Sequence, residues 1–168
     1  MPWGEAVLLT VPAWISDLEI ERIVASQRDW IARERARQRP RLRLDPSDVC
    51  EAEARLAARE LVAMVIDEEV PRLGVSPRRI QIRDQRSRWG SCSTRGTLSF
   101  NWRLVLAPFD VLDYVVVHEL CHLLEPNHSR RFWKLVEARR PRWRTQRGWL
   151  REHGAELLAF KTSNHNEN

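Results

Sequence analysis

The segment between Pro108 and Pro126 constrains the fold of this 168-residue chain more than any other. Proline is favoured in the first turn of a helix and cannot continue one, so the two prolines predict a helix over residues 109–124. The segment is largely apolar, with Val115–Val117 in its middle. We therefore expect it to be buried. Burying histidine side chains there without polar partners would cost free energy, which indicates that they bind a ligand.

Two histidines of this helix, His118 and His122, lie four residues apart. They project from the same face, about 40° apart around the axis, and can bind one tetrahedral cation together. Glu119 points about 100° away from His118, where it flanks the metal and can take a proton from a metal-activated water. This HExxH pattern predicts a zinc site with Glu119 as the general base.

A catalytic zinc ion needs a third protein ligand and an open position. Glu125 shares the face of both histidines if the helix continues, whereas His128 lies ten residues past His118 and beyond Pro126. The offset of His128 matches the longer motif HExxHxxGxxH. Glu125 stands where that motif has glycine, and both methionines precede the motif, so we do not expect a metzincin. We favour His128 as third ligand, with Glu125 as a supporting residue or the fallback ligand.

The rest of the chain predicts helices on both sides of a few short strands. The expected helices span about 16–39, 47–69, 129–139 and 141–158, and the expected strands lie around 80–82, 88–92 and 97–102. This order predicts an α+β fold with a small, mostly antiparallel sheet, an HExxH helix and flanking helices. We expect Gly90 and Gly96 to form turns. The strand over 97–102 is expected to lie beside the HExxH helix and to pair with an extended substrate.

Composition limits the partners and the compartment. Three cysteines without CxxC spacing argue against a disulfide framework and favour a reducing cytoplasm. No apolar run reaches the ~18 residues that a membrane-spanning helix needs, so no membrane partner is expected. The net charge of +5 is concentrated in arginines over 28–43 and 130–151. Interspersed glutamates favour a solvated surface over a nucleic-acid interface, although a polyanionic partner stays open.

Several separate blocks resemble the YgjP-like metallopeptidase family, which is related to the SprT and WLM zincins. They are Arg88–Ser93, Asn101–Leu104, Asp113–His122, Asn127–Ser129 and Phe132–Trp133, in this order, within about 80–149. The resemblance implies a zincin-like core in which His118, His122 and His128 hold one zinc ion and Glu119 is the general base. We expect a single domain over 1–161, including a helical N-terminal section over about 14–72, and a disordered tail over 162–168.

Two arginines in these blocks, Arg88 and Arg103, are candidates for contact with a substrate carboxylate or a developing oxyanion. Salt bridges are the alternative role for both.

The leading functional hypothesis is a zinc metallopeptidase that hydrolyses peptide bonds in a peptide or protein substrate. A nucleoside triphosphate pyrophosphohydrolase is a second hypothesis, because a metal-activated hydroxide can also attack phosphorus. No glycine-rich phosphate loop supports it. A SprT-like protease acting on nucleic-acid-bound proteins is the third.

Overall fold

The computed structural model describes residues 15–16, 18–20, 22–23 and 50–162. Contacts divide the chain into two units, residues 1–39 and 40–168, and each is treated by itself. In the first unit, residues 18–20 and 22–23 are helical. The Ser16 hydroxyl accepts from the Glu19 amide at 3.4 Å, and the Glu19 carboxylate accepts from the Ser16 amide at 3.2 Å, which forms a capping box. The remainder of the helix expected over 16–39, and the arginines over 28–43, lie outside the described residues.

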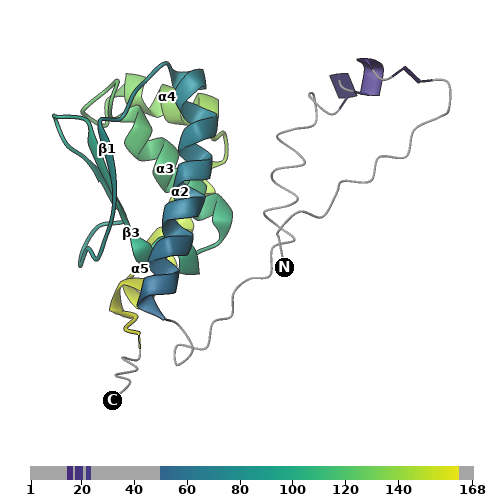
Figure 1. Ribbon diagram of the computed structural model, residues 1–168. Helices are drawn as coiled ribbons and strands as arrows, with labels where there is room; N and C mark the ends of the chain where they lie inside the picture. Colours follow the sequence, from purple (N-terminus) through teal and green to yellow (C-terminus); the bar gives the residue numbers. More distant parts are fainter. Residues whose placement is uncertain (1–14, 17, 21, 24–49, 163–168) are drawn as a thin grey trace. The chain divides into compact units, whose positions relative to one another are not determined.

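The second unit contains the sheet and the principal helices (Figure 1). The helices are α2 (Glu51–Leu73), the 3-10 helix η2 (Trp102–Leu106), α3 (Phe109–Cys121), α4 (Arg130–Arg139) and α5 (Trp143–Ala159), and the strands are β1 (Arg79–Arg83), β2 (Gly90–Cys92) and β3 (Thr97–Asn101). This arrangement confirms the expected α+β class. The expected single domain over 1–161 includes residues outside the described part and stays a prediction, as does the disordered tail over 162–168.

The strand order in the sheet is β1-β3-β2. β1 pairs with β3 in parallel, with Ile82 opposite Phe100, and β2 pairs with β3 antiparallel, with Ser91 opposite Ser99. The expectation of a mostly antiparallel sheet is therefore wrong: the sheet is mixed. The chain reverses between β1 and β2 and again between β2 and β3, so β1 and β3 run the same way. Because β3 lies between the other two strands, it meets β1 in parallel.

β3 is also not the strand that can pair with a substrate. Its backbone is hydrogen-bonded to β1 on one side and to β2 on the other. Strand addition needs an unpaired edge, so the earlier expectation for residues 97–102 is corrected. Within the described part of the chain, the two edges of the sheet belong to β1 and β2.

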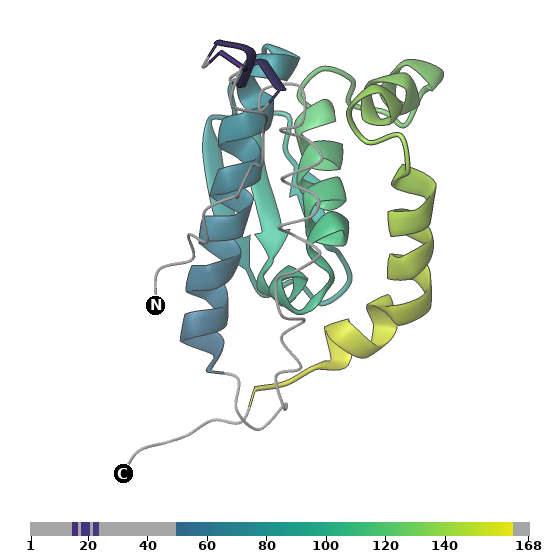
Figure 2. The same ribbon diagram turned by 90° about the vertical axis from the view of Figure 1, so that its right-hand side faces the viewer.

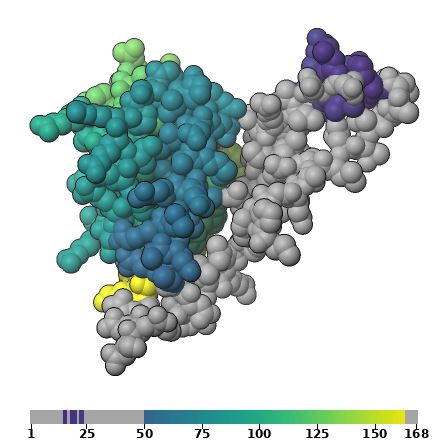
Figure 3. Space-filling view, in the orientation of Figure 1, coloured from purple at the N-terminus to yellow at the C-terminus, as the bar shows by residue number. Residues whose placement is uncertain are grey.

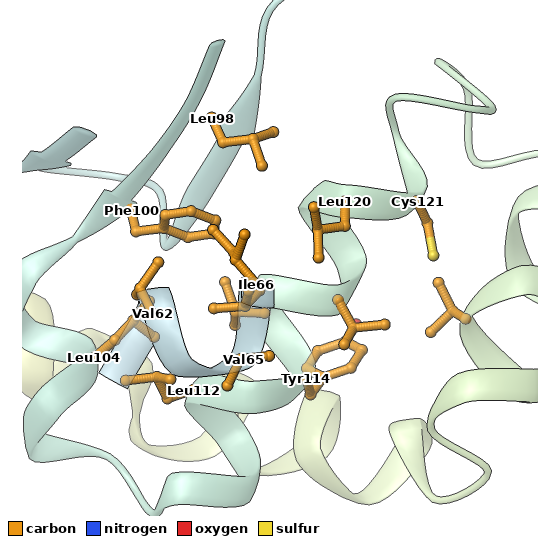
Figure 4. Close-up of a cluster of buried hydrophobic side chains, with 14 of the residues drawn as sticks. Val62, Val65, Ile66, Leu98, Phe100, Leu104, Leu112, Tyr114, Leu120 and Cys121 are labelled. Atoms are coloured by element: carbon orange, nitrogen blue, oxygen red, sulfur yellow. The ribbon is translucent and has the colours of Figure 1, made fainter. Parts of the chain in front are cut away.

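The helices α2 and α3 lie side by side against one face of the sheet, and α5 flanks α3 (Figure 2). Leu98 and Phe100 of β3 are fully buried and belong to the same hydrophobic cluster as Val62 of α2 and Leu112 of α3 (Figure 4). The outer side of α2 remains at the surface beside the strands (Figure 3). Helix α3 is thus the central element, buried along most of its length as its apolar sequence predicts.

A buried ionic network joins α2, α3 and α4. Glu69 of α2 is fully buried, and its carboxylate accepts from Arg139 Nε at 2.6 Å and from Arg140 Nη1 at 3.1 Å. Arg140 also pairs with Asp113 of α3. Burial raises the pKa of Glu69, but the hydrogen bonds and charges of Arg139 and Arg140 outweigh it and hold that pKa below its usual value. The network holds α4 against α3.

In the part of the chain that the structure describes, no helix combines the length and apolar character needed to cross a membrane.

Candidate metal centre

The first two histidines of the candidate site lie at the C-terminal end of α3. His118 is in the last turn, and His122 is the C-cap residue with φ −67° and ψ −17°, which keeps it in helical conformation. Their ring centroids are 4.9 Å apart. The α-helix ends at Cys121, three residues before the expected end, and a turn continues to Glu125, whose amide donates to the Cys121 carbonyl at 3.0 Å.

The turn before α4 brings the third histidine, His128, to the other two. His128 Nε2 lies 3.0 Å from His118 Nε2, and one donor atom from each histidine falls within a 4.8 Å group. Two nitrogen ligands of a tetrahedral zinc ion, each about 2.0–2.1 Å from the metal, would lie roughly 3.3 Å apart. The donor set is three imidazoles, a set that zinc takes in catalytic sites. The residues present therefore fit such an ion.

Hydrogen bonds at the rear nitrogens orient two of the imidazoles. His122 Nδ1 lies 3.1 Å from the Glu125 carbonyl, to which it donates, so that Nε2 keeps its lone pair for a metal. His118 Nδ1 lies 3.5 Å from the Tyr114 hydroxyl. Burial, followed by the charges of neighbouring histidines, lowers the pKa of His118 to about 3. His118 is thus neutral at physiological pH, as a metal ligand must be.

Aromatic rings of α4 pack against the three imidazoles. Phe132 stacks on His122 at a centroid distance of 4.4 Å, and Trp133 stacks on His128 at 5.5 Å. Helix α4 begins at Arg130, two residues after His128, and the Ser129 hydroxyl caps it by accepting from the Phe132 amide at 3.2 Å. The cap places His128 and its supporting rings at one end of the same helix.

Glu119 is buried, with only 6% of its surface exposed, and its side chain approaches β2. A Cβ added at Gly90 would lie 2.6 Å from Glu119 Cγ and 2.7 Å from Oε1, so the carboxylate fits only because residue 90 is glycine. Burial raises the pKa of Glu119 to about 7, against a smaller opposing effect of the Arg88 charge. A carboxylate with a pKa near 7 is suited to act as a general base at neutral pH.

The position of Gly90 corrects the sequence-based expectation that it forms a turn. Gly90 is in β2 and does not have a positive φ, whereas Gly96 does, at 76°. Sequence reasoning missed the contact with Glu119. A glycine inside a strand often marks a close approach of another group, and that signal was present in the sequence.

The structure gives the three other candidate residues, Glu125, Arg88 and Arg103, different surroundings. The Glu125 carboxylate lies 3.4 Å from Arg131 Nε and is not in the group of converging donor atoms, so Glu125 supports His122 through its carbonyl instead. Arg88 is exposed and places its charge near Glu119. Arg103 is buried: its Nε donates to the Phe160 carbonyl at 2.8 Å.

Arg103 is therefore committed to packing rather than to a substrate. It also pairs with Asp84 and lies over the Trp102 ring, 4.5 Å from the centroid. Asn101, which sequence reasoning passed over, is fully buried and donates to the Gln85 carbonyl at 2.7 Å. It fixes the loop that precedes β2 and thereby Gly90.

One surface groove among the described residues lies apart from the histidines. A groove of about 420 Å³ follows the edge of β1 and is lined by Arg59 and Arg79–Arg83. None of these residues belongs to the histidine cluster or contacts Glu119, so the groove is not part of the candidate centre.

Fold and site together describe a small α+β domain in which three imidazoles converge and the residue after His118, Glu119, is a buried carboxylate. A family model for the YgjP-like metallopeptidase domain matches residues 45–153, which is well over half of the chain. The chain therefore belongs to this family, and the match includes α2, which lies before the motif blocks. Membership supports a metallopeptidase acting on a protein or peptide substrate. Among curated proteins, none matches the chain.

Proposed function

We propose that this chain is a zinc-dependent metallopeptidase in which His118, His122 and His128 hold one zinc ion and Glu119 is the general base. One observation carries the proposal. The Nε2 atoms of His118 and His128 lie 3.0 Å apart, with His122 completing the group, while Glu119 is the next residue along α3. The pKa of this buried carboxylate, raised to about 7, supports a role as general base next in sequence to a three-imidazole donor set.

The chemistry divides between the ion and the protein. A zinc ion held there would lower the pKa of a water molecule and polarise the carbonyl of the scissile bond. Glu119 would take one proton from that water and pass it to the nitrogen of the leaving amine. Tyr114 and the Glu125 carbonyl would hold His118 and His122 in orientation.

The unpaired edge of β2 is the best candidate for binding an extended peptide. Among the described residues β2 is bonded to β3 on one side only, and its first residue, Gly90, is packed against Glu119. A peptide added as a further strand would run past the general base, with main-chain hydrogen bonds supplying affinity.

The test is the variant Glu119→Gln. It should bind zinc with the stoichiometry of the unmodified protein, but its cleavage of a labelled unfolded protein should fall by about 100-fold or more, because amide nitrogen cannot accept the proton. Glu137→Gln is the matched control, since Glu137 is exposed and pairs with Arg144. Undiminished cleavage by Glu119→Gln would remove the proposed role of Glu119.

The two alternative functions from the sequence can be tested in the same preparation. The potential metal-ligating group among the described residues is the three histidines, with no carboxylate cluster of the kind that magnesium–phosphate chemistry uses. Release of pyrophosphate from nucleotides would favour the pyrophosphohydrolase. A steep dependence of DNA affinity on salt would favour a protease recruited to nucleic acid.

A further inference from the structure

Arg147 of α5 lies one aromatic ring away from the three-histidine cluster. Its guanidinium carbon is 5.3 Å from the Trp133 ring centroid. The Trp133 ring in turn lies 5.5 Å from the ring of His128 and 5.8 Å from that of His118. Arg147 thus stands beside the proposed metal site although it comes from a different helix, about 20 residues further along the chain than His128.

Arg147 differs from the neighbouring arginine on the same helix. Arg144 lies over the Trp143 ring, 4.4 Å from its centroid, and pairs with Glu137 at 2.8 Å. Arg147 is exposed, and within residues 50–162 no carboxylate forms an ion pair with it. Contact with a tryptophan face can hold a guanidinium in place while its N–H donors stay available.

The charge of Arg147 adds to that of Arg88 around the site. Arg88 is exposed and acts on Glu119, and in the described part of the chain it also has no carboxylate partner. The carboxylate of Glu119 is buried, and that of Glu125 is paired with Arg131. Two available guanidinium groups therefore flank the site, one near the base and one near His128, and the local field favours a negatively charged ligand.

Resting on the proposed peptidase function, we propose that Arg147 is a substrate-binding residue that selects peptides with a carboxylate close to the scissile bond. The guanidinium fork binds a carboxylate through two parallel hydrogen bonds, which gives direction as well as affinity. The carboxylate can belong to an acidic side chain or to the C-terminus of the peptide, and the experiment below separates these two sources.

Binding is measured with the Glu119→Gln protein, with and without zinc, so that peptides stay intact. The probes are short fluorescein-labelled peptides of neutral sequence in which one glutamate, or a matched glutamine, occupies each position in turn. Each is made with a free and with an amidated C-terminus. We expect a carboxylate at one position to tighten binding by about fivefold, as a partly exposed charge pair does. Adding Arg147→Gln should remove this preference while leaving the neutral peptides unaffected.

Arg144→Gln is the matched control and should keep the preference, because Arg144 is already paired. Thermal unfolding and zinc binding of Arg147→Gln should equal those of its parent. The inference is overturned if a carboxylate tightens binding at no position, or if the preference for a carboxylate survives in Arg147→Gln. It is also overturned if Arg147→Gln weakens the binding of charged and neutral peptides by the same factor. Cleavage of neutral peptides without preference would leave the proposed function standing and remove only this inference. If the unmodified protein cleaves no peptide but binding still depends on a carboxylate, the proposed function is removed. The recognition of a carboxylate by Arg147 then still stands.

Discussion

At the scale of single residues, the position of the candidate base Glu119 depends on its contact with Gly90. Glu119 sits in a space that a side chain at residue 90 would occupy, with 2.6 Å between its Cγ and an added Cβ. The nearest atom, Cγ, is close to the backbone of the buried Glu119 side chain. The clash therefore cannot be relieved by rotating only the end of that side chain. A substitution at Gly90 should therefore act on the carboxylate position first.

We expect Gly90→Ala to lower kcat/KM by roughly 10- to 100-fold, because small displacements of a catalytic group are costly. Zinc content should stay the same, since the three atoms nearest to the added Cβ all belong to Glu119. Overpacking should also cost about 1–3 kcal/mol of the free energy of unfolding.

Gly148→Ala is the control for this substitution. Gly148 lies in α5, and no atom lies within 4 Å of an added Cβ, so alanine should stabilise the helix by about 0.5–1 kcal/mol and leave cleavage unchanged. Full activity in Gly90→Ala would contradict the proposed contact.

At the scale of elements, Glu69 links α2 to the end of α4. Its carboxylate is fully buried and is satisfied by Arg139 and Arg140, while Arg140 also pairs with Asp113 of α3. Arg139 is the last residue of α4 and Arg140 is its C-cap, while His128 lies two residues before its start. The network therefore helps to keep the third histidine in reach of the other two.

Replacing Glu69 by glutamine should cost ~3 kcal/mol of the free energy of unfolding at neutral pH, because a fully buried carboxylate then no longer balances the charges of the two half-buried guanidinium groups it contacts. The pKa of Glu69 is lowered in the folded state. Its contribution is thus present above the unfolded-state value of about 4.3 and is lost as pH falls through the lower folded-state pKa. The difference between the two proteins, measured by denaturant unfolding across pH, should shrink below about pH 4.

Glu68→Gln is the matched control on the same helix. Glu68 pairs with Arg72 at the surface, with 42% of its side chain exposed, so its loss should change stability by less than ~0.5 kcal/mol. An equal effect of the two substitutions would contradict the role given to the buried network.

The whole molecule has a hydrophobic core that does not depend on a metal ion. Leu98, Phe100, Leu112 and Val116 are fully buried between the sheet and its two covering helices, and none is a metal-donating residue. His118 and His122 lie at the C-terminal end of α3 and are half-buried, and His128, in the turn before α4, is exposed. Such a site is expected to use its ion for chemistry rather than for folding.

Removal of zinc by a chelator should therefore abolish cleavage while the far-ultraviolet circular dichroism spectrum stays unchanged. The Tm should fall, since an ion at 100 times its Kd contributes about 2.7 kcal/mol of linkage. His128→Ala should lose most of the zinc-dependent shift in Tm. Loss of the helical spectrum on chelation would instead indicate a structural zinc site.

The sequence by itself determined the features that depend on local spacing. Helical periodicity places His118 and His122 on one face, and Pro126 prevents the helix from continuing to His128. The helices and the α+β class follow from the same local patterns. The three histidines predicted from these patterns are brought together in the structure, while their role as ligands stays a proposal.

Only the tertiary structure decided what depends on contacts between distant segments. The parallel pairing of β1 with β3, the contact of Gly90 with Glu119 and the approach of Arg147 to Trp133 each join different elements. The tertiary structure also pairs the Glu125 side chain with Arg131 and buries Arg103. These two residues therefore support the fold and the site, and are not candidates for contact with a substrate. Local periodicity fixes which face of an element a side chain occupies. It does not specify which other element meets that face, because this choice depends on the packing of the whole core.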